Sequence, residues 1–239
     1  MPDLDSVSAS IQDYAKAVYA LEARAGTAVS TNDLAERLGV TPGSVSAMVH
    51  KLSELGLVEH EPYRGVRLTE QGRLIALEVL RHHRLIELFL AEELGMPWDR
   101  VHAEAEVLEH VLSEELEALI SARLGHPTID PHGDPIPSPA LEIDEPRTLS
   151  LDELQIGAGG RFARVSDSNP EMLQYLAEQG IALGDHLQVC GRQPFGGPVF
   201  VRVGERELPL GGQLARVMRI ELDEPPGQPP SARRGGSRR

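Results

Sequence analysis

The stretch Ser30-Thr-Asn-Asp-Leu-Ala-Glu-Arg-Leu-Gly-Val-Thr-Pro42 decides the fold of the first part of the chain. Its first residue opens a short helix in the manner of a capping box, with Asp33 in the place of the usual Glu or Gln. Gly39 ends that helix, and Thr41, with Pro42 at the first helical position, opens the next one. The stretch therefore predicts two helices joined by a tight turn.

The flanking segments complete a familiar order of elements. Residues 10–25 carry an apolar stripe of helical period, and residues 57–61 and 66–69 have the pattern of two short strands joined by a turn. Helix, helix, turn, helix and β-hairpin is the order of a winged helix-turn-helix, which we predict over residues 1–75. We expect its third helix to enter the major groove of double-stranded DNA, although winged domains also serve as protein-interaction modules.

The candidate DNA contacts are the residues that this third helix and the hairpin would expose. The helix begins with small or hydroxylic residues, which suit phosphate hydrogen bonds, thymine-methyl contacts and shape readout better than an Arg–guanine fork. Basic residues further along are candidate phosphate contacts. The full set is Thr41, Gly43, Ser44, Ser46, Ala47, His50, Lys51, Arg64 and Arg67.

The segment His102-Ala-Glu-Ala-Glu-Val-Leu-Glu-His110 repeats metal-binding side chains at helical spacing. His102, Glu106 and His110 recur every four residues and Glu109 follows Glu106 by three, so all four share one helix face. We predict one long helix over residues 98–124 that carries this face. Such a face is typical of a divalent metal site. The alternative is an acidic surface helix that contains histidines by chance.

A second helix, predicted over residues 70–94, offers His83 and Glu87 at i, i+4. Two antiparallel helices that face each other with such groups are how bundle proteins build metal sites. The donors are nitrogen and oxygen without thiolate, which suits Mn²⁺ or Fe²⁺ at least as well as Zn²⁺. His82 points about 100° away around the helix and is interpreted as a surface or basic-patch residue.

Charge and composition agree with a metal-binding protein. The net charge of −14 is concentrated in residues 76–146, which hold 16 acidic and 4 basic residues. Bound divalent cations would relieve part of that repulsion, so metal binding and folding should be coupled. Cys190 is the only cysteine, which excludes an intrachain disulfide and a cysteine-based zinc site, and we interpret it as a small core residue. With no apolar run of about 20 residues and no secretory leader, we expect a cytoplasmic protein that does not bind a membrane.

The remaining segments predict a loop, a third domain and a tail. The second domain, residues 76–146, ends in the proline-rich segment 127–139, which we expect to be largely extended and whose His132 we interpret as structural. Residues 147–223 predict a small β-barrel with its own core. Its strands are expected at 160–165, 186–190, 198–203 and 215–220, interrupted by a helix at about 170–179. The tail, residues 224–239, has the composition of a disordered segment.

With these motifs placed, the chain resembles the diphtheria toxin repressor family of metal-dependent regulators, in its manganese-responsive branch. The resemblance covers about residues 8–222. Its motifs are Asp13-Tyr14, Arg81-His-His-Arg-Leu-Ile-Glu87, Val101-His102 through Glu109-His-Val-Leu-Ser113, and Asp130-Pro-His-Gly-Asp-Pro-Ile-Pro-Ser138. The resemblance implies a homodimer that binds palindromic operators when loaded with Mn²⁺ or Fe²⁺ and represses metal-uptake genes, with a FeoA-like third domain.

The resemblance also implies a division of the metal ligands. The primary site would use Asp13, Glu106, Glu109 and His110, and the ancillary site His83, Glu87 and His102, with Glu171 or Asp167 of the third domain as a further candidate. Asp13 and Glu106 stand where iron-type members carry methionine and cysteine, which is the manganese-type pattern. Lys16 stands where some two-domain members carry a glutamate, so we expect two separate sites rather than a closely spaced pair of ions.

The expected function is thus a metal-activated transcriptional regulator and not an enzyme. A DNA-binding regulator with a purely structural metal is the first alternative. A di-metal carboxylate enzyme is the second, although the chain lacks the duplicated Glu-x-x-His motifs of the ferritin-like bundles.

Overall fold

The computed structural model describes residues 7–61 and 65–223. The chain divides into two compact units, residues 1–145 and 146–239, each with buried apolar residues of its own. Within the described ranges, none of the helices combines the length and the apolar character that crossing a membrane requires.

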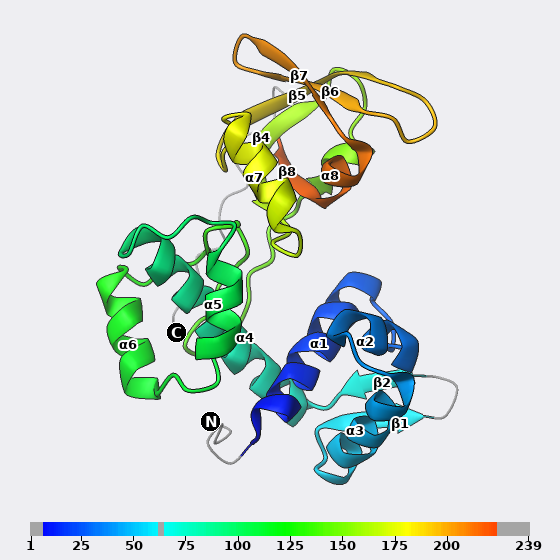
Figure 1. The fold of residues 1–239 in the computed structure, drawn as a ribbon, viewed down its shortest axis with the longest axis vertical. Helices are drawn as coiled ribbons and strands as arrows, with labels where there is room; N and C mark the ends of the chain where they lie inside the picture. The colour runs from blue at the N-terminus through cyan, green and yellow to red at the C-terminus, as the bar shows by residue number, and fades with distance from the viewer. Residues whose placement is uncertain (1–6, 62–64, 224–239) are drawn as a thin grey trace, which may run out of the picture. The chain divides into compact units, whose positions relative to one another are not determined.

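The first unit begins with three helices and a two-stranded hairpin, in the predicted order (Figure 1). The elements are α1 (Ala9–Ala25), α2 (Thr31–Leu38), α3 (Pro42–Glu54), β1 (Val58–Glu61) and β2 (Gly65–Leu68). The expected caps are present: Ser30 Oγ accepts from the Asp33 amide at 3.1 Å, and Thr41 Oγ1 accepts from the Ser44 amide at 3.2 Å. The two strands are antiparallel, as a hairpin requires.

One continuous core holds these elements together. Leu34 of α2 and Val45, Val49 and Leu52 of α3 are fully buried in it. Because α3 uses this face for packing, its opposite face is left exposed along the whole helix.

The long helix α4 (Glu70–Glu92) leads from the hairpin into the rest of the first unit (Figure 1). Thr69 caps it, with Oγ1 accepting from the Gly72 amide at 3.1 Å. A Cβ at Gly72 would lie 2.0 Å from the Leu57 carbonyl oxygen, so only glycine lets the helix start this close to the hairpin. Further along, α4 contributes Leu85 and Ile86 to two small apolar clusters with the helices that follow.

The prediction of one long helix over 98–124 is wrong. The structure has two helices, α5 (Val101–Leu108) and α6 (Glu114–Arg123), separated by a bend. Ser113 caps α6 by accepting from the Leu116 amide at 3.3 Å, and three glutamates in the first turn favour a helix N-terminus there. Glu109 and His110 therefore lie just beyond the end of α5, not on its face.

The prediction that residues 127–139 are largely extended is also wrong. Residues 132–137 are buried, and the chain turns back so that the Asp130 amide donates to the Asp134 carbonyl at 2.9 Å. Two arginines of α4 hold the segment: Arg81 donates to the Pro137 carbonyl at 2.6 Å, and Arg84 donates to the Pro135 carbonyl. Proline has no backbone N–H, so this segment cannot form the regular hydrogen bonds of a β-strand. The two arginines satisfy its carbonyl groups instead.

The second unit is built on a six-stranded antiparallel sheet of order β3-β8-β4-β5-β6-β7. Phe162, Val189, Val201 and Ile220 of the sheet are fully buried, as is Leu176 of the helix α7. The elements are β3 (Leu149–Ser150), the 3-10 helix η2 (Leu151–Glu153), β4 (Gly159–Val165), α7 (Pro170–Glu178), β5 (His186–Arg192), β6 (Val199–Val203), β7 (Arg206–Leu210), α8 (Gly212–Val217) and β8 (Met218–Leu222).

Three details of this unit differ from the prediction. The strand expected at 215–220 begins as the helix α8 and becomes β8 only at Met218, and neither β3 nor β7 was anticipated. Cys190 of β5 is only partly buried, with Sγ 3.6 Å from the Gln188 carbonyl oxygen, so it is not a core residue.

Candidate metal centre and nucleic-acid interface

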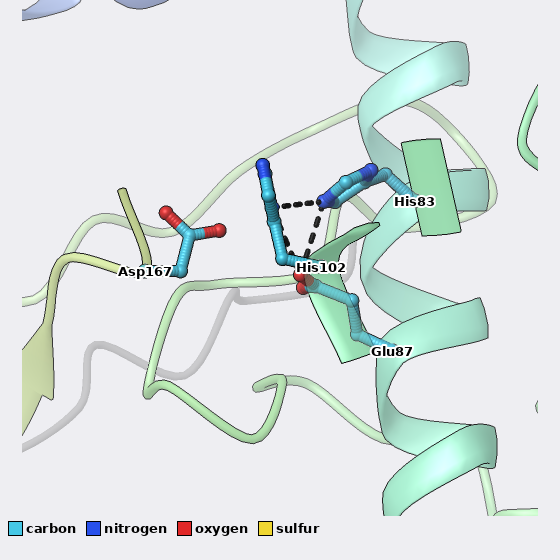
Figure 2. A group of neighbouring side chains, drawn as sticks. All are labelled: His83, Glu87, His102 and Asp167. Carbon is cyan, nitrogen blue, oxygen red and sulfur yellow. Dashed lines mark hydrogen bonds and ion pairs between the residues drawn. The ribbon is translucent and has the colours of Figure 1, made fainter. Parts of the chain in front are cut away.

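His83, Glu87 and His102 converge as the sequence predicted for the ancillary site. The first two lie one turn apart on α4, and the third lies in the first turn of α5 (Figure 2). His83 Nε2 is 3.0 Å from Glu87 Oε1 and 3.1 Å from His102 Nδ1, and His102 Nδ1 is 3.3 Å from Glu87 Oε1. Three donor atoms thus form a nearly equilateral triangle.

The size of this triangle fits a divalent ion. Donors about 2.1 Å from a common ion and about 90–100° apart lie about 3.0–3.3 Å from one another. Glu87 Oε2, buried and without a hydrogen-bond partner among the described residues, adds an unsatisfied acceptor to the same carboxylate. An ion would satisfy a charge that is costly to leave buried in this way.

The charges of His83 and Glu87 in this cluster depend on each other, because each shifts the pKa of the other. Burial by itself lowers the pKa of His83, but hydrogen bonds to Glu109 and Glu87 outweigh it and raise the pKa to about 9. Burial raises the pKa of Glu87, but the neighbouring His102, His132 and His83 outweigh it and leave the pKa below its ordinary value. At neutral pH the cluster is an imidazolium–carboxylate network, so an ion can bind through His83 only when the ring loses its proton.

Three of the four residues predicted for the primary site also meet. Asp13 comes from α1, whereas Glu109 and His110 come from the bend after α5. His110 Nε2 is 3.0 Å from Asp13 Oδ1 and 3.5 Å from Glu109 Oε1. Burial raises the pKa of Asp13 more than His110 and Lys16 lower it. This cluster therefore joins the first helix of the winged domain to the helices beyond α4.

Gln12 completes the primary cluster, and the sequence analysis missed it. His110 Nδ1 lies 2.6 Å from Gln12 Oε1, an amide oxygen that can only accept, so Nδ1 carries the proton. In that tautomer Nε2, which carries the lone pair, is the atom that could bind a metal ion. Such partners fix the tautomer of metal-binding histidines. The signal for Gln12 in the sequence was its position directly before the candidate ligand Asp13, on the same predicted helix.

The fourth predicted ligand, Glu106, groups instead with His83 and Glu109. Glu106 Oε1 lies 3.8 Å from His83 Nδ1, and Glu109 Oε2 lies 2.5 Å from the same nitrogen. The Lys16 ammonium contacts both carboxylates, at 2.7 Å from Glu106 and 2.5 Å from Glu109. The predicted primary and ancillary ligands are thus contiguous, linked through Glu109.

His132 lies closer to the ligands than its structural interpretation suggested. It is fully buried, its Nε2 is 2.7 Å from the Trp98 carbonyl oxygen, and its Nδ1 is 3.7 Å from Glu87 Oε2. Burial lowers the pKa of His132, but Glu87 and Asp130 outweigh this and raise it to about 9. His132 therefore lies near one oxygen of the Glu87 carboxylate, and His83 and His102 lie near the other.

His82 is buried, so its interpretation as a surface residue is wrong. Its Nδ1 lies 3.2 Å from the Glu109 carbonyl oxygen and its Nε2 lies 3.1 Å from Glu117 Oε2. Arg81 joins the same carboxylate, with Nε 2.7 Å from Glu117 Oε1. These contacts tie α4 to the bend and to α6, and so hold Glu109 in place.

The predicted DNA contacts that lie among the described residues are exposed. All of the predicted residues on α3 and at its cap are exposed, and Arg67 is exposed on β2: Thr41, Gly43, Ser44, Ser46, Ala47, His50, Lys51 and Arg67. The predicted contact Arg64 lies outside the described residues. The hydroxyl groups of Thr41 and Ser44 are 3.0 Å apart, so the start of α3 presents a cluster of small polar groups.

A second exposed surface is apolar. Val107, Leu108, Val111, Leu116 and Leu119, from α5, the bend and α6, are between 40% and 77% exposed. Large apolar side chains exposed together on neighbouring segments are typical of a protein-interaction site.

Comparison with known proteins identifies the family of the chain. Three family models match in order: the iron-dependent repressor N-terminal DNA-binding domain over residues 6–66, the iron-dependent repressor metal-binding and dimerisation domain over 69–138, and the FeoA domain over 149–222. The iron-dependent repressor IdeR of Mycobacterium tuberculosis is 30% identical over 220 residues, covering 87% of this chain and 95% of the relative. The diphtheria toxin repressor of Corynebacterium glutamicum is 30% identical over 222 residues, covering 88% and 95%.

A solved structure of a manganese-dependent transcriptional repressor in complex with manganese is also similar. It is 42% identical, with a TM-score of 0.84, and the match covers 89% of this chain and 99% of the other. The class of protein is therefore a metal-dependent DNA-binding transcriptional repressor, not an enzyme. The chain belongs to the diphtheria toxin repressor family of iron- and manganese-dependent repressors. The predicted fold class is confirmed: winged helix, helical metal-binding and dimerisation domain, and FeoA domain.

Proposed function

We propose that the protein is activated by Mn²⁺, with Fe²⁺ as the second candidate, to bind a palindromic operator as a homodimer and repress metal-uptake genes from the cytoplasm. The observation that carries the proposal is the 3.0 Å approach of His110 Nε2 to Asp13 Oδ1. These two groups come from different domains of the first unit. A cation held between them would fix the winged domain relative to the helices of the dimerisation domain.

The proposed ligands are those predicted from the sequence. The primary set is Asp13, Glu106, Glu109 and His110, and the ancillary set is His83, Glu87 and His102, with Glu171 or Asp167 still a candidate from the third domain. The 3.0–3.3 Å triangle of donor atoms at the ancillary set supports its part of this assignment. At the primary set, support comes from the Gln12 contact, which leaves His110 Nε2 as the ligand atom.

The choice of Mn²⁺ rests on the donor chemistry. The proposed ligands offer carboxylate oxygen and imidazole nitrogen, and no cysteine or methionine sulfur is among them. Hard oxygen donors suit Mn²⁺, whereas sulfur would favour later and softer metals. Affinity alone would rank Fe²⁺ above Mn²⁺, so the response in the cell also depends on which ion is available.

The homodimer would form through the apolar surface of Val107, Leu108, Val111, Leu116 and Leu119. Two copies of α3 could then reach successive major grooves only if their separation matched one helical turn of DNA, about 34 Å. A metal that fixes each winged domain relative to this interface would set the separation. Moving the protein from 1% to 99% competent requires about 5.5 kcal/mol of differential metal affinity, which two sites per protomer can supply.

The test is a titration of operator DNA binding against buffered free Mn²⁺. The operator would be selected from random duplexes by the Mn²⁺-loaded protein. We expect binding only with metal, release by EDTA, and a steep fall in affinity with salt, because phosphate contacts release counterions. The His110→Ala variant should lose the Mn²⁺ response. His186→Ala is the matched control, since His186 lies on β5 with its side chain 58% exposed.

Two results would contradict the proposal. Tight, sequence-specific binding by the EDTA-treated protein would rule out a metal switch. Metal binding that leaves DNA affinity unchanged would mean that the metal is purely structural.

A further inference from the structure

Lys16 places a positive charge among the predicted metal ligands, where it would repel a metal ion. It lies on α1 one turn after Asp13, and its side chain is only 14% exposed. Its ammonium nitrogen is 2.7 Å from Glu106 Oε1 and 2.5 Å from Glu109 Oε1. A covalently attached positive charge thus already contacts two carboxylates to which the proposed function assigns a divalent ion.

The carboxylates that Lys16 contacts have few alternative partners. The Glu109 side chain is fully buried, and its other oxygen, Oε2, is 2.5 Å from His83 Nδ1. Glu106 Oε1 has histidine nitrogens only at longer range, 3.8 Å to His83 and 3.7 Å to His102. Among the described residues, Lys16 is therefore the cation that contacts both carboxylates at hydrogen-bond distance, whereas His83 contacts only Glu109 at that distance.

The ammonium form of Lys16 is favoured by these partners. Burial by itself lowers the pKa of Lys16, but the carboxylates of Glu109 and Glu106 outweigh burial and raise the pKa above its ordinary value. The side chain is thus a cation at physiological pH, and its ion pair with the buried Glu109 is little screened by salt.

We propose that Lys16 is a built-in competitor of the regulatory metal, which holds Glu106 and Glu109 in the metal-free protein and thereby raises the free metal concentration needed to activate the repressor. The inference rests on the proposed function, because it assumes that Glu106 and Glu109 serve the metal.

The competition has two sources. An ion that binds Glu106 and Glu109 must replace two charge-assisted hydrogen bonds from the ammonium. If the ammonium stays nearby, it repels the divalent ion across a few ångströms. Both effects lower metal affinity, whereas in the metal-free protein the ammonium stabilises the fold by compensating the buried Glu109 carboxylate.

Removal of the Lys16 charge should therefore change two properties in opposite directions. Metal-free stability should fall, and affinity for the metal should rise by at least about tenfold, since a divalent ion and an ammonium a few ångströms apart repel each other strongly even at an effective dielectric constant of about 20. A lysine that only supports the fold would show a different result, because its loss would weaken stability and metal affinity together.

The experiment compares the full-length dimer with its Lys16→Met variant, which has a similar chain length and no charge. Mn²⁺ affinity is measured by competition with a chelating dye, and metal-free stability by the melting temperature in EDTA. Lys16→Arg keeps the charge and should stay close to the unaltered chain in affinity. Arg202→Met is the matched control, because it removes one positive charge from an exposed side chain of β6.

A second measurement needs no substitution. The chain has two lysines, Lys16 and Lys51, and Lys51 is exposed on α3. Acylation followed by mass spectrometry should label Lys16 far more slowly than Lys51 in EDTA. Saturating Mn²⁺ should raise the Lys16 to Lys51 ratio, because the ion takes the carboxylates that hold the ammonium and lowers its proton affinity.

The outcomes separate the two proposals. Tighter Mn²⁺ binding by Lys16→Met together with a lower melting temperature in EDTA supports the competitor role. Equal or weaker binding by a folded Lys16→Met dimer overturns it. If that variant does not fold, a labelling ratio that Mn²⁺ leaves unchanged overturns the role. Failure of the unaltered chain to bind Mn²⁺ is seen before any variant is compared, and that result overturns the proposed function itself.

Discussion

The metal-free protein should lose stability as the pH rises from about 6.5 to 9, because His83 is held as an imidazolium. Glu109 and Glu87 face its two ring nitrogens, at 2.5 Å and 3.0 Å, and raise its folded-state pKa to about 9 from the ordinary 6.5. A raised folded-state pKa contributes stability that is fully present below the unfolded-state value and is lost as the pH rises through the folded-state value. Deprotonation of His83 therefore weakens the metal-free fold.

The size of the effect follows from the shift. One pKa unit corresponds to about 1.4 kcal/mol, so a shift from 6.5 to about 9 is worth roughly 3 kcal/mol of unfolding free energy. His132, whose pKa is also raised to about 9, acts in the same direction. Both imidazoles depend on the Glu87 carboxylate, so their contributions are coupled and do not simply add.

Trp98, the only tryptophan, provides the assay. Its ring stacks on His132 with centroids 6.1 Å apart, so its fluorescence reports unfolding of the metal-binding region rather than of the third domain. Urea unfolding of the EDTA-treated protein at pH 6, 7.5 and 9.5 should show a progressive loss of roughly 3 kcal/mol. His83→Gln should remove most of this slope, while His186→Gln should keep it, since the His186–Asp223 pair is more than half exposed. A metal-free free energy of unfolding that stays constant from pH 6 to 9.5 would refute the imidazolium network.

Three other predictions concern metal selectivity, the division of the ligands and DNA contacts. Replacing Asp13 by methionine and Glu106 by cysteine introduces two sulfur donors. The double variant should therefore lose most of its Mn²⁺ response and keep activation by Fe²⁺, Co²⁺ or Ni²⁺. An unchanged ranking of these metals in operator-binding titrations would mean that the primary site lies elsewhere. His110→Ala should raise the Mn²⁺ concentration for half-maximal operator binding by at least about 100-fold and His83→Ala by about tenfold, and equal effects would contradict the division into primary and ancillary sites. Lys51→Ala should weaken binding to all duplexes similarly and reduce the salt slope, measured as log affinity against log salt, by about 1; a loss restricted to one sequence would indicate a base contact instead.

Local signals in the sequence were sufficient for the winged domain. Ser30, Thr41 and Thr69 each cap the helix predicted to follow, because a cap depends on residues within one turn of it. The exposed face of α3 follows from the same reasoning, since burying Val45, Val49 and Leu52 determines which residues are left outside. The approach of the predicted ligands His83 and Glu87 to each other was also recoverable, because they lie at i, i+4 on one helix.

Contacts between distant segments were not recoverable in this way. Lys16 lies 90 residues before Glu106, and Gln12 lies 98 residues before His110, so no local pattern pairs them. The bend after α5 was missed because the His and Glu spacing continued through it, although Ser113 and the glutamates that follow it form a helix start. His82 was misplaced because a helical position alone does not tell which neighbours cover it.

The bend is what lets Glu109 act as the link between the clusters. Because α5 ends at Leu108, Glu109 can enter the interior, where its side chain is fully buried. Its Oε1 faces Lys16 and His110, on the side of the winged domain, and its Oε2 faces His83, on the side of α4. A buried carboxylate cannot lose one partner without another taking its place, since an uncompensated charge there would cost several kcal/mol. A change of partner at either oxygen must therefore alter the balance at the other, and this single side chain couples the position of α1 to the protonation of the His83 cluster.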